Sequence, residues 1–201
     1  MSMIAGGVFL FCYLFLTYVT NVDFPVHSEG VVLVTGAGSG LGRHAAEHLS
    51  ALGFTVLAGV RKEKDMETIA ALDNPRLQPL MMDVSSHESC VAAVNIITAR
   101  LDREAMPLVA VVHNAGVGRL SPAEFHSMDD ARAMFDTNFF GIMDLTQLTL
   151  PLLRSARGRV VMISSLAGLV GNPKNSVYSA SKFALEGFSD ALRREVRPFN
   201  V

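Results

Sequence analysis

The stretch of sequence that decides the fold reads VVLVTGAGSGLG and occupies residues 31–42. Its first part, Val31–Thr35, is a short run of mostly β-branched residues, which is typical of a buried strand. Glycines then recur at every second position, and apolar residues at helical spacing follow over Ala45–Leu52. The stretch therefore predicts a strand, a tight turn and a helix, in that order.

The glycine spacing in this turn favours a phosphate-binding loop. Gly36, Gly40 and Gly42 give G-x-x-x-G-x-G, which differs from the G-x-G-x-x-G of the common dinucleotide fingerprint. Small residues at these places permit a close approach of the backbone to a pyrophosphate, which the N-terminus of the following helix attracts. A glycine loop that binds no ligand would have the same composition, but the strand before it and the helix after it favour the dinucleotide interpretation.

Outward from this turn, strand-like and helix-like segments alternate along the chain. This alternation predicts the α/β class, a doubly wound parallel sheet whose ligands bind beyond the carboxyl ends of the strands. The further predicted strands are Phe54–Val60, Leu77–Met82, Leu108–Val112 and Arg159–Ile163, and the further predicted helices are Lys62–Leu72, Glu88–Leu101, Asp129–Leu153 and Tyr178–Val196.

The composition excludes several classes of function. A chain of 201 residues with 50% hydrophobic residues suits about one packed domain. The formal net charge of −2, without a basic stripe, argues against nucleic-acid binding. Two cysteines, Cys12 and Cys90, are too few for a disulfide framework, and no Cys/His cluster is present, so we expect no metal site.

The N-terminal stretch differs from the rest of the chain. Residues 1–22 carry no charged side chain and are rich in Phe, Leu and Tyr, which predicts a single-pass transmembrane anchor. A cleaved signal peptide and a buried core helix are the alternatives. Residues 23–29 are interpreted as a linker and residues 30–201 as one nucleotide-binding domain. No Lys or Arg precedes Arg43, so the side of the membrane stays open.

A second constellation, Tyr178-Ser179-Ala180-Ser181-Lys182, indicates acid–base chemistry. Positions i and i+4 share a helix face, so the Lys182 ammonium can approach the Tyr178 phenol and favour its phenolate form. An exposed Tyr and Lys on a helix surface would show the same short pattern, so its meaning depends on the motifs around it.

Taken together, these residues resemble the short-chain dehydrogenases/reductases over roughly residues 30–201. The glycine turn matches the cofactor loop of that family, Asp83-Val84 its adenine-contacting segment, and Asn114-Ala115-Gly116 the turn after its fourth strand. The resemblance implies a Rossmann fold with strand order 3-2-1-4-5. It implies cofactor contacts from Thr35, Gly36, Ser39, Gly40, Leu41, Gly42, Arg61, Asp83, Val84, Asn114, Ala115, Gly116, Tyr178 and Lys182, and catalysis by Asn138, Ser165, Tyr178 and Lys182.

The resemblance also assigns a role to each catalytic residue. Tyr178 would exchange the proton of the alcohol while the nicotinamide exchanges hydride with the carbon. Ser165 would hydrogen-bond the same oxygen, Lys182 would serve both the phenol and the cofactor ribose, and Asn138 would steady a water in a proton relay. In isolation, Ser165 could instead cap a strand end, and Asn138 could be a solvated position in a helix.

Two positions depart from the family pattern near the cofactor. Gly59 stands at the end of the second strand, where an acid would bind the 2′-hydroxyl of NAD(H), and Arg61 and Lys62 follow. Cations there suit a 2′-phosphate, so we expect NADP(H) in preference to NAD(H), unless the two simply open a solvated helix. His113 precedes Asn114 where Asn is more usual, and we interpret it as a hydrogen-bonded strand-end residue.

The resemblance is strongest to membrane-associated hydroxysteroid and retinol dehydrogenases, through Asn138-Phe139-Phe140-Gly141 and residues 178–187. It implies a small lipophilic substrate, a membrane location such as the endoplasmic reticulum, and a homodimer through the long helices. The family continues past Val201 into a sixth strand and a substrate lid, so we expect a fragment of a longer product, with a natural short form as the alternative. A catalytically impaired, membrane-tethered dinucleotide-binding or scaffold protein is the alternative function.

Overall fold

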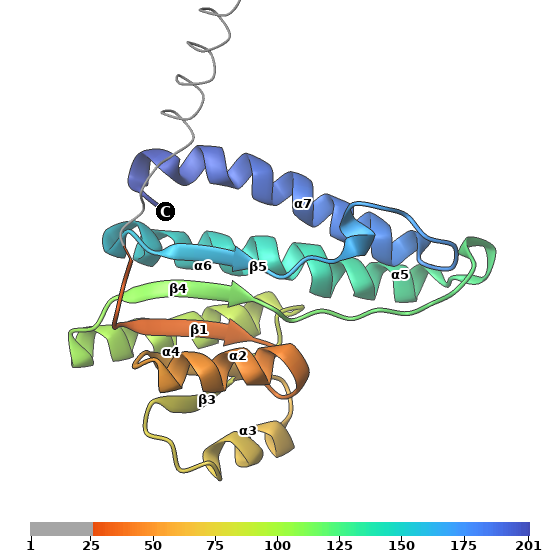
Figure 1. Ribbon diagram of the computed structural model, residues 1–201. Coiled ribbons are helices and arrows are strands. Elements are labelled where there is room, and N and C mark those ends of the chain that lie inside the picture. Colours follow the sequence, from red (N-terminus) through yellow and green to blue (C-terminus); the bar gives the residue numbers. More distant parts are fainter. Residues whose placement is uncertain (1–25) are drawn as a thin grey trace, which may run out of the picture.

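The computed structural model describes residues 26–201, so the predicted anchor at 1–22 and the first residues of the predicted linker lie outside the described residues. The described part is one α/β unit (Figure 1). Its elements are β1 Val31–Thr35, α2 Gly40–Ala51, β2 Thr55–Val60, α3 Glu63–Ala70, β3 Leu77–Met81, α4 His87–Glu104, β4 Leu108–His113, α5 Met128–Phe135, α6 Gly141–Ala156, β5 Arg159–Met162 and α7 Ser176–Val196, with short 3₁₀ turns between some of them.

The five strands form one parallel sheet in the order β3-β2-β1-β4-β5, as the sequence predicts. The central strand β1 pairs with β2 on one side, where Leu33 lies opposite Leu57, and with β4 on the other, where Leu33 lies opposite Val111. Because all strands are parallel, their carboxyl ends meet at one edge of the sheet. The connections that leave these ends therefore lie side by side.

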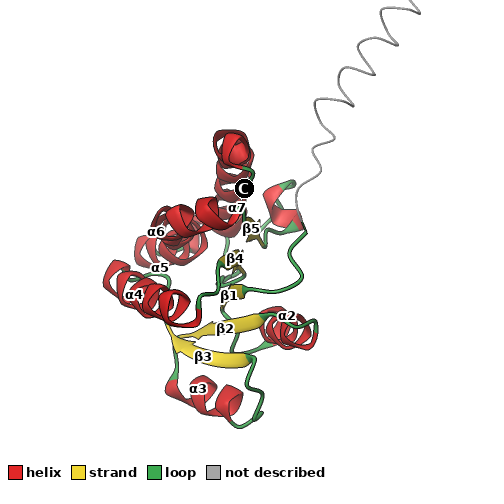
Figure 2. Cartoon of the chain, turned by 90° about the vertical axis from the view of Figure 1, so that its left-hand side faces the viewer, coloured by secondary structure: helices red, strands yellow, loops and turns green. Residues whose placement is uncertain are grey.

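The helices cover both faces of the sheet. From β1 the chain moves outward in one direction through β2 and β3, and then returns to build β4 and β5 on the other side. Right-handed crossovers consequently place the first helices on one face and the later ones on the opposite face. Figure 2 shows α2 on one side of the sheet and α4, α5 and α6 on the other.

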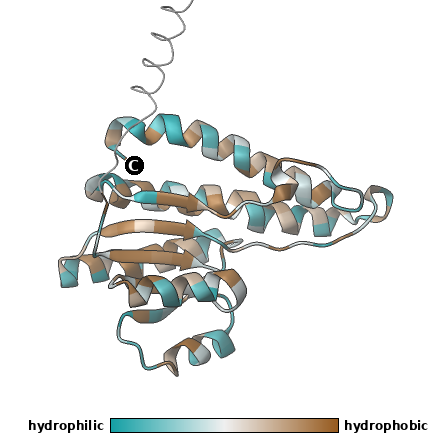
Figure 3. Cartoon of the chain, viewed as in Figure 1, coloured by the Kyte–Doolittle hydropathy of each residue, from teal (hydrophilic) through white to brown (hydrophobic). Residues whose placement is uncertain are grey.

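The core has two halves, one on each face of the sheet. Alternate side chains of β1 point to opposite faces. Val31 and Leu33 pack with Cys90, Ile97 and other residues of the α4 and α6 side, whereas Val32 and Val34 pack on the α2 side. All residues of β1 and β2 are buried, and the central strands are almost uniformly apolar in Figure 3. A parallel sheet covered on both faces requires this pattern.

The predicted single helix over Asp129–Leu153 is wrong in one respect. The structure divides this segment into α5 and α6, joined by a π-helical turn over Asp136–Phe140. Asn138 lies in that turn and is fully buried. Apolar spacing does not reveal such an insertion, because the extra residue shifts the helix face without interrupting the helix. Turns of this kind are frequently found at functional sites.

The helix after the glycine turn begins at Gly40, five residues before the predicted start at Ala45. Gly40 and Gly42 thus belong to the first turn of α2, where apolar periodicity gives no signal.

Among residues 26–201, no helix has both the length and the apolar character needed to cross a bilayer. The only cysteine in this part of the chain, Cys90, is buried in α4 with a free thiol, and burial raises its pKa to about 11.

Candidate active site

A cleft of about 300 Å³ runs along the carboxyl ends of β1, β2, β3 and β4. Its walls come from the glycine turn, from the connections after β2, β3 and β4, and from the π-helical turn. The residues lining it are Gly36, Gly38, Ser39, Gly59, Val60, Arg61, Lys62, Asp65, Met82, Asp83, Val84, Asn114, Ala115, Gly116, Val117 and Thr137. This is the place where open α/β sheets bind their ligands.

Two turns pack against each other to shape the floor of the cleft. A Cβ atom on Gly36 would lie only 2.8 Å from the Cα atom of Ala115, and Gly36 has a φ of +64°. A Cβ atom on Gly42 would collide with the Asn114 side chain and the Gly36 carbonyl oxygen. Glycine is therefore required at both positions, by close approach at 42 and by conformation as well at 36. The Asn114 amide donates to the carbonyl oxygens of Thr35, at 3.0 Å, and Gly36, at 3.2 Å.

Thr35 acts within the fold rather than in the wall of the cleft. Its side chain is buried, and its Oγ1 accepts hydrogen bonds from the backbone N–H groups of Asn114 and Ala115, both at 3.0 Å. The hydroxyl donates in turn to the carbonyl oxygen of Val112. Thr35 thus joins the end of β1 to the turn after β4, which fixes the spacing of the two turns.

Asp83 lies on the far side of the cleft, after β3. Its Oδ1 accepts hydrogen bonds from the backbone N–H group of Ser85 at 3.0 Å and from the Ser85 hydroxyl at 2.7 Å. Burial raises the pKa of Asp83, but these hydrogen bonds and the positive charge of Arg61 lower it further, so the net shift is downward. The carboxylate is therefore ionised at neutral pH, and Arg61 lines the same cleft.

Asn138 holds the turn after β4 onto α7. Its Oδ1 accepts from the backbone N–H group of Val117, and its Nδ2 donates to the Val117 carbonyl oxygen, both at 2.8 Å. The same Nδ2 donates to the hydroxyl of Ser181, the neighbour of Lys182, at 3.1 Å. The side chain thus positions two parts of the site at once. The predicted role in a water relay stays a prediction.

Lys182 and Tyr178 project from the first turns of α7. The Lys182 side chain is 4% exposed, and its Nζ donates to the carbonyl oxygen of Ile163, just beyond β5, at 2.9 Å. The same Nζ lies 5.9 Å from the centre of the Tyr178 ring. Burial lowers the pKa of Lys182, and the Glu186 carboxylate offsets this only in part. The Lys182 amine is thus held near the face of the Tyr178 ring in a poorly hydrated place.

Ser165 lies at the start of the 3₁₀ turn Leu166–Gly168, after β5. Its Oγ accepts a hydrogen bond from the backbone N–H group of Ala167 at 3.2 Å. A serine hydroxyl has one hydrogen to donate as well as lone pairs that accept. Accepting from Ala167 therefore leaves the Ser165 hydrogen available for a substrate oxygen.

The structure brings most of the predicted site residues to one edge of the sheet. Gly116 links the cleft with the Tyr178–Lys182 pair, because a Cβ atom at Gly116 would lie 3.4 Å from the Asn138 Oδ1 and 3.8 Å from the Lys182 Nζ. Six predicted cofactor residues do not line the cleft: Thr35, Gly40, Leu41, Gly42, Tyr178 and Lys182. Gly40 and Gly42 instead shape the start of α2, and Leu41 is 74% exposed there.

Sequence reasoning missed several residues of this site. Val117 holds Asn138 and Ile163 holds Lys182 through backbone carbonyl oxygens, which leave no signal in a sequence. Ser181 holds Asn138 through its side-chain hydroxyl. Asp65 could have been found, because it lies in the first turn of the helix that follows β2, close to Arg61 and Lys62. The residues present fit a dinucleotide: a tight glycine turn at a helix start, an open cleft beyond the strands, and charged groups at one end.

Comparison with known proteins places the chain in a family. The sequence profile described as short chain dehydrogenase matches residues 30–201, so the chain belongs to the short-chain dehydrogenase family. It is 38% identical to the mitochondrial D-beta-hydroxybutyrate dehydrogenase of Bos taurus, over 92% of this chain and 54% of that protein. It is 39% identical to estradiol 17-beta-dehydrogenase 2 of Mus musculus, over 94% of this chain and 50% of that protein.

A solved structure shows the same fold. A short-chain dehydrogenase from Streptomyces avermitilis matches with a TM-score of 0.78 and 34% identity, covering 87% of this chain and 63% of the other. The chain spans about half the length of the two curated relatives that it matches. The family profile, over residues 30–201, includes the glycine turn, the cleft and the Tyr178–Lys182 pair.

Proposed function

We propose that this chain carries the cofactor and proton-transfer site of an NAD(P)(H)-dependent oxidoreductase. The reaction interconverts a lipophilic primary or secondary alcohol and its aldehyde or ketone. The observation that carries this proposal is the buried Lys182 ammonium, which the Ile163 carbonyl oxygen fixes beside the Tyr178 ring at the end of the dinucleotide cleft. A bound nicotinamide dinucleotide would supply or accept the hydride.

Each polar residue has a place in this chemistry. Tyr178 donates its phenolic proton to the carbonyl oxygen during reduction and takes the alcohol proton during oxidation. Ser165 donates its remaining hydroxyl hydrogen to the same oxygen. Lys182 stabilises the phenolate and binds the nicotinamide ribose. Asn138 is a positioning residue, because its amide groups hold Val117 and Ser181.

The two cations that follow β2 support a preference for NADP(H). Arg61 and Lys62 line the cleft, and Gly59 offers no carboxylate for a 2′-hydroxyl. Two observations support a lipophilic substrate. One relative is named for a steroid, estradiol. The stretch 1–22 is uncharged, and we propose it to be an anchor in an internal membrane such as the endoplasmic reticulum. Carbonate extraction that releases the intact protein would contradict the anchor.

A partner is part of the same proposal. We expect a second copy of this chain to associate through the long helices, α6 and α7. Sedimentation of the detergent-solubilised protein should give twice the mass of one chain, and a single-chain mass over the micromolar range would exclude this dimer.

The experiment that tests the proposed function combines binding with a single turnover. The full chain is titrated with NADPH and NADH, and each complex is then mixed with a panel of hydrophobic ketones and aldehydes while cofactor oxidation is followed. We expect binding of a dinucleotide and oxidation with at least one ketone or aldehyde. Lys182→Ala should lose both, because its charge serves ribose and phenol. Binding without any oxidation would favour the catalytically impaired, tethered protein instead.

A further inference from the structure

The end of the cleft between β2 and α3 contains charges of both signs. Four ionisable residues line the whole cleft: Arg61, Lys62, Asp65 and Asp83. Two are cations and two are carboxylates, so their formal charges cancel. A cleft built only to hold a doubly charged 2′-phosphate would have an excess of positive charge.

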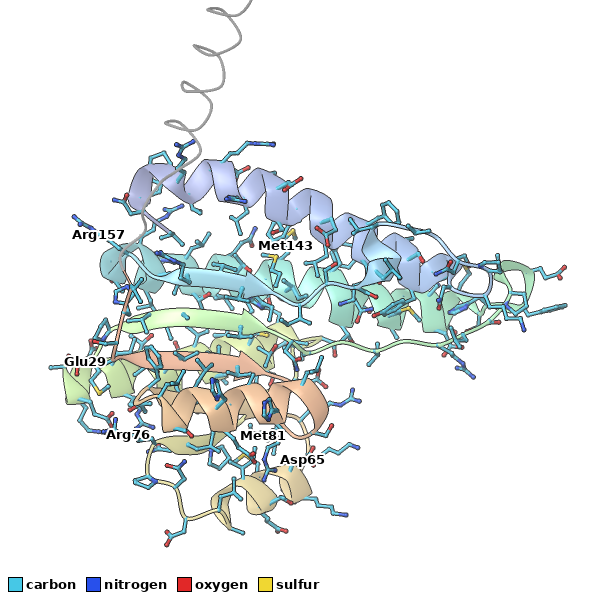
Figure 4. The ribbon with its side chains drawn as sticks, in the orientation of Figure 1. Glu29, Asp65, Arg76, Met81, Met143 and Arg157 are labelled. Atoms are coloured by element: carbon cyan, nitrogen blue, oxygen red, sulfur yellow. The ribbon has the colours of Figure 1, made fainter. Side chains whose placement is uncertain are left out.

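Asp65 is the less exposed charged residue at this end. It is the third residue of α3, where its backbone N–H group donates to the Lys62 carbonyl oxygen at 3.0 Å. Asp65 is half-buried, whereas Arg61 and Lys62 are exposed. Figure 4 labels Asp65 in the space between α2 and α3. A burial difference of this kind strengthens the interaction of Asp65 with a bound ligand relative to that of the two exposed cations.

The Asp65 carboxylate lies directly against the glycine turn. A Cβ atom on Gly38 would lie 2.6 Å from the Asp65 Oδ2 and 2.7 Å from its Cγ. Glycine at position 38 therefore makes room for this carboxylate. In a dinucleotide fold the adenosine ribose lies between the glycine turn and the carboxyl end of the second strand. The acid that Gly59 does not supply from β2 thus reaches the same region from α3.

The positive charge of Arg61 also acts on Asp83, which lines the same cleft. It helps to lower the pKa of Asp83, after the two hydrogen bonds from Ser85. The negative charge of Asp83 in turn reduces the positive potential that a phosphate would meet near Arg61. Lys62 remains as an exposed cation, and exposed charges are screened by solvent and salt.

We propose that Asp65 limits the preference of this site for NADP(H), by accepting a hydrogen bond from the 2′-hydroxyl of NAD(H) and repelling the 2′-phosphate of NADP(H). The proposal rests on the proposed function, in that it assumes a dinucleotide in the cleft. Asp65 then acts against Arg61 and Lys62, and the site accepts both cofactors with a modest difference in affinity. Removal of the Asp65 charge should turn a modest preference for NADP(H) into a strong preference for NADP(H).

The test measures Kd for NADPH and NADH in the full chain and in two variants. Asp65→Asn removes the charge and keeps the shape of the side chain. Glu67→Gln is the matched control, because Glu67 is an exposed acid on the same helix that does not line the cleft. We expect Asp65→Asn to shift the NADPH-to-NADH affinity ratio toward NADPH by about tenfold, and Glu67→Gln to shift it less than about twofold.

Other outcomes overturn the proposal. Equal changes for both cofactors in Asp65→Asn would show a structural role for Asp65, and an equal shift in Glu67→Gln would show a long-range effect of net charge. Should Asp65→Asn fail to fold, Asp65→Ser keeps a helix-start residue and must give the same shift in ratio. If the wild-type chain binds neither dinucleotide, the proposed function fails together with this inference. Binding with an unchanged ratio refutes Asp65 alone.

Discussion

Arg61 is the residue from which the expected preference for NADP(H) draws its main support. Replacement by Ala removes one charge-assisted contact with a phosphate, which is worth about 1.5 to 3 kcal/mol. We expect Arg61→Ala to weaken NADPH binding by about tenfold or more and NADH binding by much less. Isothermal titration of both cofactors measures this. Lys64→Ala is the control, since Lys64 is an exposed cation on α3 outside the cleft; a wild type that binds NADH more tightly would reverse the preference.

His113 makes the stability of the protein depend on pH. The side chain is buried beneath the site, where its Nε2 lies 3.1 Å from the Thr146 hydroxyl, and burial lowers its pKa to about 4. An unfolded histidine titrates near 6.5. Between pH 6.5 and about pH 4, His113 is protonated in the unfolded chain but neutral in the folded chain. Its contribution to the free energy of unfolding is therefore complete above about pH 6.5 and is lost as the pH falls toward 4.

The predicted loss is about 3 kcal/mol in the free energy of unfolding. Urea unfolding at pH 7, 5.5 and 4.5 measures it. His113→Asn should flatten this part of the pH profile, whereas His44→Asn should not, because His44 is an exposed residue on α2. Identical slopes in wild type and His113→Asn would exclude His113 as the source.

Among the elements, the π-helical turn between α5 and α6 is predicted to support both stability and binding. Asn138→Ala leaves the N–H and C=O groups of Val117 without their side-chain partner, at about 1 to 3 kcal/mol for each buried group. We expect a lower midpoint in urea and weaker dinucleotide binding. Asn95→Ala removes an exposed asparagine of α4 and should leave both unchanged. An Asn138→Ala protein with wild-type stability and binding would refute the positioning role.

Replacing a helical glycine by Ala should lower the stability of the protein at one position and raise it at another. Gly42, in α2, packs against Asn114 and Gly36, so Gly42→Ala should unfold the turn or abolish dinucleotide binding. Gly187, in α7, is exposed, and a Cβ atom there meets no described atom within 4 Å. Because Ala is the better helix former, Gly187→Ala should raise the free energy of unfolding by about 0.5 to 1 kcal/mol. Thermal unfolding distinguishes the two; a stabilised Gly42→Ala would contradict the packing described.

These elements also show what the sequence could predict. The parallel sheet was predictable because β-branched runs alternate with helical spacing, and its strand order was predictable from the family resemblance. The π-helical turn and the early start of α2 were not, since neither interrupts apolar spacing in a recognisable way. At the site, the motif residues were recognisable from the sequence. The hydrogen bond from Lys182 to Ile163 was not, because it uses a backbone carbonyl oxygen that any residue type supplies.

For the molecule as a whole, one geometric fact organises the site. All five strands are parallel, so the glycine turn, the Asn114 turn, Asp83 and Ser165 all follow strand ends at the same edge of the sheet. Helix α7 then adds Tyr178 and Lys182 to that edge, through the bond between Lys182 and the Ile163 carbonyl oxygen. Residues that are far apart in the sequence therefore form one site at this edge.

The central claim is that Tyr178 transfers the proton at this edge while the rest of the site binds the dinucleotide. The most direct measurement compares wild type with Tyr178→Phe, by following single-turnover oxidation of NADPH with a reactive ketone and dinucleotide affinity in the same samples. We predict that Tyr178→Phe slows turnover by at least about 100-fold and that its dinucleotide Kd stays within about threefold of the wild-type value, because the phenol acts in proton transfer and little in binding. Turnover at the wild-type rate in Tyr178→Phe would contradict the account.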